Sequence, residues 1–221
     1  LAYARHGADV IITSRKVATC EAVAEEVRAL GRRALAIASH MGSWADIDAL
    51  VDAAYAEFGS IDILVNNAGM SPLAPASHET SEALFDKGMA VNFKGPFRLG
   101  ALVAARMAAG NGGAIINVSS TGALRPLAGV VPYCGGKAAL NAMTESFAKE
   151  YGPKVRVNTL SAGPFLTDIS KAWPEEARER FDNAVGRPGR PEEVITSALY
   201  LASPMSSYVT GSLVRVDGGI P

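Results

Sequence analysis

The chain has 221 residues, a mass of 23.0 kDa and a formal net charge of −1 at pH 7. A pI near 6.4 is atypical of nucleic-acid-binding proteins, which are normally basic. Hydrophobic residues make up 48% and charged residues 19%, which excludes a disordered chain, and no apolar run is long enough to span a membrane. Cys20 and Cys134 form no C-x-x-C pair, so we expect no metal site and a reducing, cytoplasmic setting.

The first third of the chain alternates between short β-branched runs and patterns of helical spacing. Strands are expected over 9–13, 33–38 and 62–65, and helices over 17–30 and from Ser43 to Phe58. Ser43 and Asp46 have the spacing of a capping box, which marks the beginning of the second helix.

The same alternation continues to the C-terminus. Helices are expected over 81–109, 132–151, 174–184 and 191–202, and strands over 114–118, 155–160 and 213–216. Strands separated by helices predict a parallel sheet covered on both faces. The sequence therefore predicts an α/β fold, a Rossmann-like doubly wound sheet in a single domain, residues 1–221.

The beginning of the chain breaks this pattern. Residues 1–6 have helical composition and stop at Gly7, but they make up less than two turns. They are interpreted as the end of a helix whose preceding strand is missing from the chain, so that the domain is N-terminally incomplete. In the strand order 3-2-1-4-5-6 that strand would lie in the middle of the sheet and carry the phosphate-binding loop, and no G-x-G-x-x-G is present.

Residues suited to acid–base chemistry gather between positions 66 and 137. Tyr133 and Lys137 are four apart on an expected helix, so they share a face, and a nearby cation favours the phenolate. An incidental surface pair is an equally good explanation of that spacing alone. Ser120, just past the strand 114–118, and the run 66–69, after the strand 62–65, stand where ligands bind in open parallel sheets.

Together these segments resemble the short-chain dehydrogenase/reductase family, in its small single-domain branch. The resemblance covers nearly the whole chain and rests on motifs in family order: Asn66-Asn-Ala-Gly69, Val91-Asn92, Ile116-Asn-Val-Ser-Ser120, Tyr133-x-x-x-Lys137, Arg156-Val-Asn158, Arg187-x-x-Arg190-Pro-Glu-Glu193, Tyr208-Val-Thr-Gly211 and Val216-Asp-Gly-Gly219.

The resemblance implies a catalytic tetrad of Asn92, Ser120, Tyr133 and Lys137. Tyr133 would be the general acid in carbonyl reduction, Ser120 would hydrogen-bond the carbonyl oxygen, and Lys137 would hold the nicotinamide ribose and depress the pKa of Tyr133. The implied cofactor contacts are Ser14, Arg15, Met41, Asn67, Ala68, Gly69, Tyr133, Lys137, Phe165 and Thr167. The family also implies a homotetramer, with the helices 81–109 and 132–151 in one interface and the helix 191–202 with the last strand in another.

The sequence departs from the family at several points. The usual first strand and T-G-x-x-x-G-x-G loop are absent, and Ala162-Gly163-Pro164 stands where Pro-Gly is common. Ser39-His40-Met41 stands where an Asp commonly meets adenine, which leaves open whether His40 contacts the cofactor or is a plain loop residue. Two functions therefore remain: a nicotinamide-dependent carbonyl reductase, which the full tetrad favours, and a non-catalytic binding or scaffold protein without the phosphate loop.

The turn after the first strand bears on cofactor choice. Ser14-Arg15-Lys16 has two cations and no acid, and in Rossmann-type sites an acid bonds the ribose 2′-OH whereas Arg accommodates a 2′-phosphate. We therefore expect NADP(H) rather than NAD(H).

Substrate identity is less readable. The segment 164–184 is expected to form a lid, with Phe165, Leu166, Ile169 and Trp173 offering apolar surface, or simply packing against the body. Met70, Leu73 and Pro75 would line the opposite wall. This favours a small, partly apolar ketone or aldehyde, or a 3-oxoacyl thioester, over a sugar.

Pro96 predicts a break in the helical stretch 81–109. Proline cannot donate to the carbonyl of Asn92, and its ring crowds that carbonyl, so the helix should kink with Gly95 easing the distortion. The free carbonyl would hold a water that relays protons to Lys137 and Tyr133, as the resemblance implies. The alternative is that Pro96 merely bends the helix around the sheet.

Overall fold

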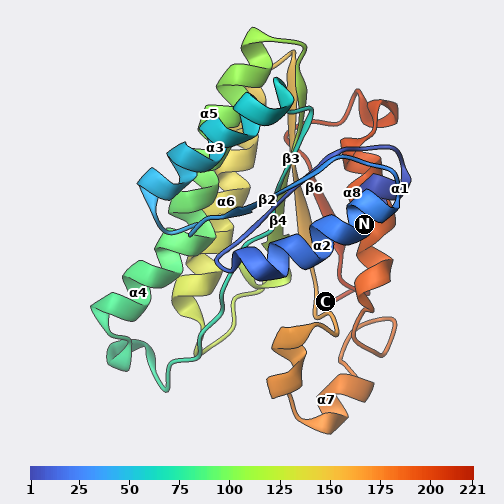
Figure 1. Cartoon of the computed structure of the whole chain (residues 1–221). Coiled ribbons are helices and arrows are strands. Elements are labelled where there is room, and N and C mark those ends of the chain that lie inside the picture. The colour runs from blue at the N-terminus through green and yellow to red at the C-terminus, as the bar shows by residue number, and fades with distance from the viewer.

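The computed structural model describes the backbone of residues 1–221 and every side chain except those of Ile169 and Ala172. Its helices and strands alternate along the chain (Figure 1), in the order α1 Ala2–Arg5, β1 Val10–Ser14, α2 Val17–Ala29, β2 Ala34–Ala38, α3 Trp44–Phe58, β3 Ile63–Asn66, α4 Glu82–Met89, α5 Gly95–Ala109, β4 Gly113–Ser120, α6 Val131–Glu150, β5 Val155–Ala162, α7 Glu175–Glu179, α8 Ile195–Ala202 and β6 Leu213–Val216. No helix among the described residues combines the length and apolar character that a membrane crossing requires.

All strand pairs are parallel, but they form two sheets. One sheet pairs β1 with β2, and the other has the order β3-β4-β5-β6. In the doubly wound order 3-2-1-4-5-6, one strand stands between the positions that β1 and β3 occupy here. Among the described strands, none pairs with both β1 and β3.

Helices cover both faces of the larger sheet (Figure 1). On one face lie α3, α5 and α6, and on the other lies α8, which α1 contacts through a hydrogen bond from the Tyr3 hydroxyl to the Ala198 carbonyl (3.1 Å). Successive strand residues point to opposite faces, so Ile115 joins the large core under α3, α5 and α6 while Ile116 joins the smaller core under α8. The fold is thus the Rossmann-like single domain that the sequence predicted.

The helical stretch 81–109 is not continuous. A π-helical turn, Ala90–Lys94, separates α4 from α5, and the amide of Gly95 donates to the carbonyl of Ala90, five residues back. Pro96 has no N–H, so it cannot donate to the main-chain carbonyl of Asn92, and the helix is interrupted by the wider turn at this point. Gly95 has a further role: a Cβ built there would lie 1.8 Å from the Met41 carbonyl oxygen, so only glycine allows this approach.

Four other element boundaries differ from expectation. The strand expected over 114–118 extends to Ser120, so that Ser120 ends β4 instead of following it. The helix expected over 174–184 is only α7, with a 3₁₀ turn, Asp168–Ala172, ahead of it. The helix expected over 191–202 begins with a 3₁₀ turn, Pro191–Val194. Strand β5 continues to Ala162, which brings its end level with that of β4.

Buried polar side chains tie α6 to the sheet. Thr144 on α6 accepts hydrogen bonds from Asn117 Nδ2 (2.9 Å) and from the Thr159 hydroxyl (2.9 Å), and it donates to the Leu140 carbonyl (3.0 Å). Asn117 Oδ1 accepts in turn from Asn66 Nδ2 (2.8 Å). This chain links β3, β4 and β5 to one point of α6 and uses all the hydrogen-bonding capacity of the Thr144 hydroxyl.

Candidate active site

Tyr133 and Ser120 meet where the first turn of α6 faces the end of β4. The Ser120 hydroxyl accepts from the Gly122 amide (3.0 Å), which leaves its own proton to donate, and a Cβ built on Gly122 would contact both Ser120 Oγ (3.4 Å) and Tyr133 Cε1 (3.7 Å). Burial raises the pKa of Tyr133, while the hydrogen bond with Ser120 lowers it. The pKa of Tyr133 thus lies above its ordinary value here, the opposite of the direction expected from Lys137.

Lys137 is buried, with 4% of its surface exposed. Its ammonium donates to the Val118 carbonyl (2.8 Å), and burial lowers the pKa of Lys137 from 10.5 to about 8. The ammonium is therefore held next to β4, and it releases its proton at a lower pH than an ordinary lysine does.

Asn92, fully buried in the π-helical turn, holds the loop after β3. Its Oδ1 accepts from the Met70 amide (3.1 Å) and its Nδ2 donates to the Met70 carbonyl (2.8 Å). A Cβ on Gly69 would lie 3.2 Å from Asn92 Oδ1 and 3.3 Å from Lys137 Nζ, so both groups lie against this glycine. The structure thus places Asn92 near Lys137, beside the loop after β3, and Ser120 near Tyr133, at the end of β4. Tyr133 and Lys137 are both on α6.

The predicted cofactor contacts lie at the ends of the strands. Ser14 ends β1, its hydroxyl accepts from the Lys16 amide (3.3 Å), and Arg15 follows as an exposed residue. Asn67, Ala68 and Gly69 are exposed directly after β3.

The two loop residues after β2 have local structural roles. His40 Nδ1 accepts from the Gly42 amide (3.0 Å), and the Met41 carbonyl lies against Gly95. The His40 ring is therefore bonded to its own loop through Nδ1.

Phe165 and Thr167 follow β5. Phe165 pairs with Gly189 in an isolated bridge, and a Cβ on Gly189 would lie 2.6 Å from the Phe165 ring. Thr167 is exposed at the N-terminal end of the 3₁₀ turn, where its carbonyl accepts from the Ser170 hydroxyl (2.8 Å).

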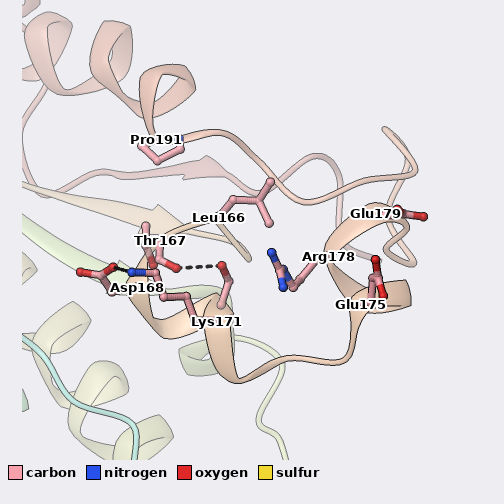
Figure 2. Close-up of a pocket in the computed structure, with 9 residues that line it drawn as sticks. Leu166, Thr167, Asp168, Lys171, Glu175, Arg178, Glu179 and Pro191 are labelled. Atoms are coloured by element: carbon pink, nitrogen blue, oxygen red, sulfur yellow. Dashed lines mark hydrogen bonds and ion pairs between the residues drawn. The ribbon is translucent and has the colours of Figure 1, made fainter.

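A cavity of about 590 Å³ lies beside Thr167 (Figure 2). Charged and polar residues predominate in its lining, although the sequence led us to expect an apolar lid, and of the expected apolar residues whose side chains are described, Leu166 is the one that lines it. The lining is formed by Leu166, Thr167, Asp168, Ser170, Lys171, Glu175, Arg178, Glu179 and Pro191. Figure 2 shows Arg178 extending from α7 toward Leu166, whereas Glu179 points away from the cavity. Leu73, expected in the opposite wall, is 80% exposed, and the side chain of Ile169 lies outside the described residues.

Ser119 is a contact of the site that the sequence reasoning did not single out. Its buried hydroxyl donates to the main-chain carbonyl of Lys137 (3.2 Å). The available signal was strand periodicity, because Ser119 shares its face of β4 with Asn117 and Ile115, both of which face α6.

Comparisons with known proteins agree with this architecture. A family profile described as enoyl-(acyl carrier protein) reductase matches residues 1–221. The chain is 35% identical to D-threitol dehydrogenase of Mycolicibacterium smegmatis, over 99% of the chain and 85% of that protein, and 34% identical to 3-oxoacyl-(acyl-carrier-protein) reductase of Thermotoga maritima, over 100% and 90%. A solved 7α-hydroxysteroid dehydrogenase complexed with NADH superposes with a TM-score of 0.92 at 32% identity, covering 99% of this chain and 86% of that one.

The chain belongs to the short-chain dehydrogenase/reductase family. It is an oxidoreductase that acts on carbonyl and CH–OH groups with NAD(P).

Proposed function

We propose that this protein is an NADP(H)-dependent carbonyl reductase in which Tyr133 is the general acid and base. The observation that supports this most is the pairing of Tyr133 with the Ser120 hydroxyl, which the Gly122 amide holds in place by donating to its oxygen. Ser120 has one proton to donate, either to the phenol oxygen or to a substrate carbonyl placed between the two.

The residues at the strand ends fit a dinucleotide. Gly69 supplies a surface without a side chain beside Asn92 and Lys137, where a flat ring and a ribose could approach the backbone. When bound, the cofactor supplies the hydride. Lys137 would turn from the Val118 carbonyl to the ribose hydroxyls, which brings its charge nearer to Tyr133 and favours the phenolate.

Arg15 supports the choice of NADP(H). It is exposed at the end of β1, and its side chain has no ion-pair partner within 4.0 Å among the described residues, so its guanidinium is available to a 2′-phosphate.

Proton supply would come through the π-helical turn. The Asn92 side chain bonds to the main chain of Met70, whereas its main-chain carbonyl cannot receive a donor from Pro96. We propose that this carbonyl holds a water that passes protons from bulk solvent to Lys137 and then to Tyr133.

The proposed substrate is a small ketone, aldehyde or 3-oxoacyl group.

A homotetramer fits the exposed apolar side chains on the expected interface elements, among them Phe97 on α5 and Tyr200 on α8. Light scattering that gave a monomer would contradict the tetramer. The two buried free cysteines, Cys20 and Cys134, fit a reducing, cytoplasmic compartment.

A carbonyl panel tests the activity and the cofactor together. Ketones, aldehydes and 3-oxoacyl thioesters would be offered with NADPH and with NADH, and we expect turnover with a higher kcat/KM for NADPH. Arg15→Ala should lower kcat/KM for NADPH about tenfold or more and leave that for NADH within about twofold. Arg5→Ala, which removes an exposed cation from α1, is the matched control. Cofactor binding without turnover of any carbonyl would favour the non-catalytic alternative, and a wild-type preference for NADH would refute the cofactor choice.

A further inference from the structure

Two opposed hydrogen bonds join the end of β4 to the middle of α6. The Ser119 hydroxyl donates to the Lys137 carbonyl (3.2 Å), and the Lys137 ammonium donates back to the Val118 carbonyl (2.8 Å). Ser119 and Lys137 are 3% and 4% exposed, so both bonds are shielded from water. Consecutive residues of a strand thus hold the backbone and the side chain of one helical residue.

The position of Ser119 on the strand makes this contact possible. Side chains alternate along β4, and Ile115, Asn117 and Ser119 share the face that α6 covers. Ser120 is the last residue of β4, and its hydroxyl meets Tyr133 in the first turn of α6. The two neighbouring serines therefore have different partners on the same helix.

This pair of bonds joins the strand that carries Ser120 to the helix that carries Tyr133. Ser120 is the residue after Ser119, and Tyr133 lies one helical turn before Lys137 on the same face of α6. A shift of α6 along or away from β4 would move Tyr133 relative to Ser120, and catalysis is sensitive to displacements of that size. We propose that Ser119 is a positioning residue that sets the placement of Tyr133 and Lys137 against Ser120. This inference rests on the proposed function for its catalytic consequence, although its structural part does not.

Removing the Ser119 hydroxyl should leave the fold intact. The Lys137 carbonyl lies within α6 and keeps its place in the helical ladder. Two turns further on, Thr144 still ties α6 to β4 and β5, and Leu140 and Phe147 stay in the core. A Ser119→Ala variant is therefore expected to loosen one end of α6 without detaching the helix.

The first experiment needs neither cofactor nor substrate. In the protein without ligands, NMR of the lysine side chains would follow the titration of Lys137. The ammonium donates to the Val118 carbonyl, and a Cβ built on Gly69 would meet both this ammonium and Asn92 Oδ1, so these groups lie near each other; Tyr133 lies one turn before Lys137 on α6. Because burial lowers the pKa of Lys137 to about 8, a loosened helix that admits water should raise its titration midpoint.

The outcomes are defined by matched serine variants. Ser119→Ala should raise the Lys137 midpoint by about half a pH unit or more. Ser119→Thr, which keeps a hydroxyl, should restore it. Ser206→Ala removes another buried serine hydroxyl that donates to a main-chain carbonyl (Ser203, 2.8 Å), distant in sequence and element from α6, and should leave the midpoint unchanged. A midpoint within about 0.2 units of wild type in Ser119→Ala, or an equal shift in Ser206→Ala, overturns the proposal.

The second experiment measures turnover of any carbonyl that the wild type reduces. Ser119→Ala should lower kcat about tenfold with KM changed less than about twofold, because a misplaced acid weakens the transition state more than substrate binding. An unchanged kcat would also overturn the proposal. If the wild type reduces no carbonyl, the proposed function fails, and the Lys137 titration still decides whether Ser119 holds the helix.

Discussion

The two regions that carry the predicted site residues, the body formed by β4, β5 and α6 and the lid segment 164–184, are built differently. In the body, β4 and β5 pair over eight residues, and their polar side chains Asn117, Thr159 and Ser119 are buried and hydrogen-bonded to α6. The lid segment consists of a 3₁₀ turn and the five-residue α7, and most of its charged side chains are exposed. The residues proposed for chemistry thus lie in the region with buried hydrogen bonds, whereas most residues that line the cavity lie in the exposed segment.

The largest expected effect tests the body. Tyr133→Phe removes the proposed proton donor while keeping the ring, so kcat should fall about a thousandfold, equivalent to about 4 kcal/mol in the barrier. Steady-state turnover of a carbonyl with NADPH measures it. Tyr151→Phe, at the C-terminal end of the same helix, is the control and should keep kcat within about twofold. Comparable activity in Tyr133→Phe would remove the tyrosine from the mechanism.

The second prediction concerns the burial of Lys137. The pKa of Lys137 is about 8 in the folded protein, and 10.5 is the ordinary value expected in the unfolded chain. Below pH 8 the lysine is therefore protonated in both the folded and the unfolded protein, and folding carries the full penalty of burying its charge. Lys137→Met should therefore unfold with a free energy up to about 3 kcal/mol larger than wild type at pH 7, while losing activity.

The advantage of Lys137→Met should decrease as the pH rises from 8 to 10.5, because the folded wild type then releases its proton and the penalty disappears. Urea unfolding at pH 7 and pH 10 measures this. Lys149→Met, an exposed site near the end of α6, should show no such pH dependence. The prediction would be wrong if the gain in unfolding free energy of Lys137→Met over wild type were smaller at pH 7 than at pH 10.

The third prediction addresses the attachment of α6. Thr144→Val keeps the shape of the side chain but leaves Asn117 Nδ2 and the Thr159 hydroxyl without their acceptor in a buried site. We expect a loss of about 2 kcal/mol in unfolding free energy, measured by urea denaturation. Ser146→Ala, which removes an exposed hydroxyl bonded to the Ala142 carbonyl on the same helix, should change stability by less than about 0.5 kcal/mol. Equal losses in the two variants would argue against the buried chain as an anchor.

The smallest effect is expected in the lid segment. Lys171 pairs with Asp168 (2.6 Å), but the two side chains are 76% and 92% exposed, so solvent screens the pair. Lys171→Gln should shift Tm by less than about 2 °C in a thermal unfolding scan. A larger decrease in Tm would show that this segment contributes to the stability of the body, contrary to the difference drawn between the two regions.

Elements that pack against the core could be predicted from sequence more closely than the lid segment, for a physical reason. Strand 213–216 and the helix beginning at Ser43 follow from apolar periodicity and capping, which are local signals, and Ser43 does accept from the Asp46 amide (3.3 Å). The helix over 174–184 was wrong because its composition is helical while few of its residues have a core to pack against.

Within the site, the sequence could place residues but not orient them. It predicted that Tyr133 and Lys137 share a face of a helix, which the structure shows. It could not predict that Lys137 bonds to Val118, or that Asn92 uses its side chain to hold Met70, because these contacts depend on how three elements approach one another. The π-helical turn was likewise visible only as a break at Pro96.

The register of β1 and β2 has a consequence for two of the proposed cofactor contacts. Ser14 pairs with Ala38, so the two strands end at the same level. The turn that carries Arg15 and the loop that carries Met41 therefore begin side by side. A change that displaced the ends of these strands would displace both proposed contacts together, so binding of the two parts of the cofactor would weaken in step.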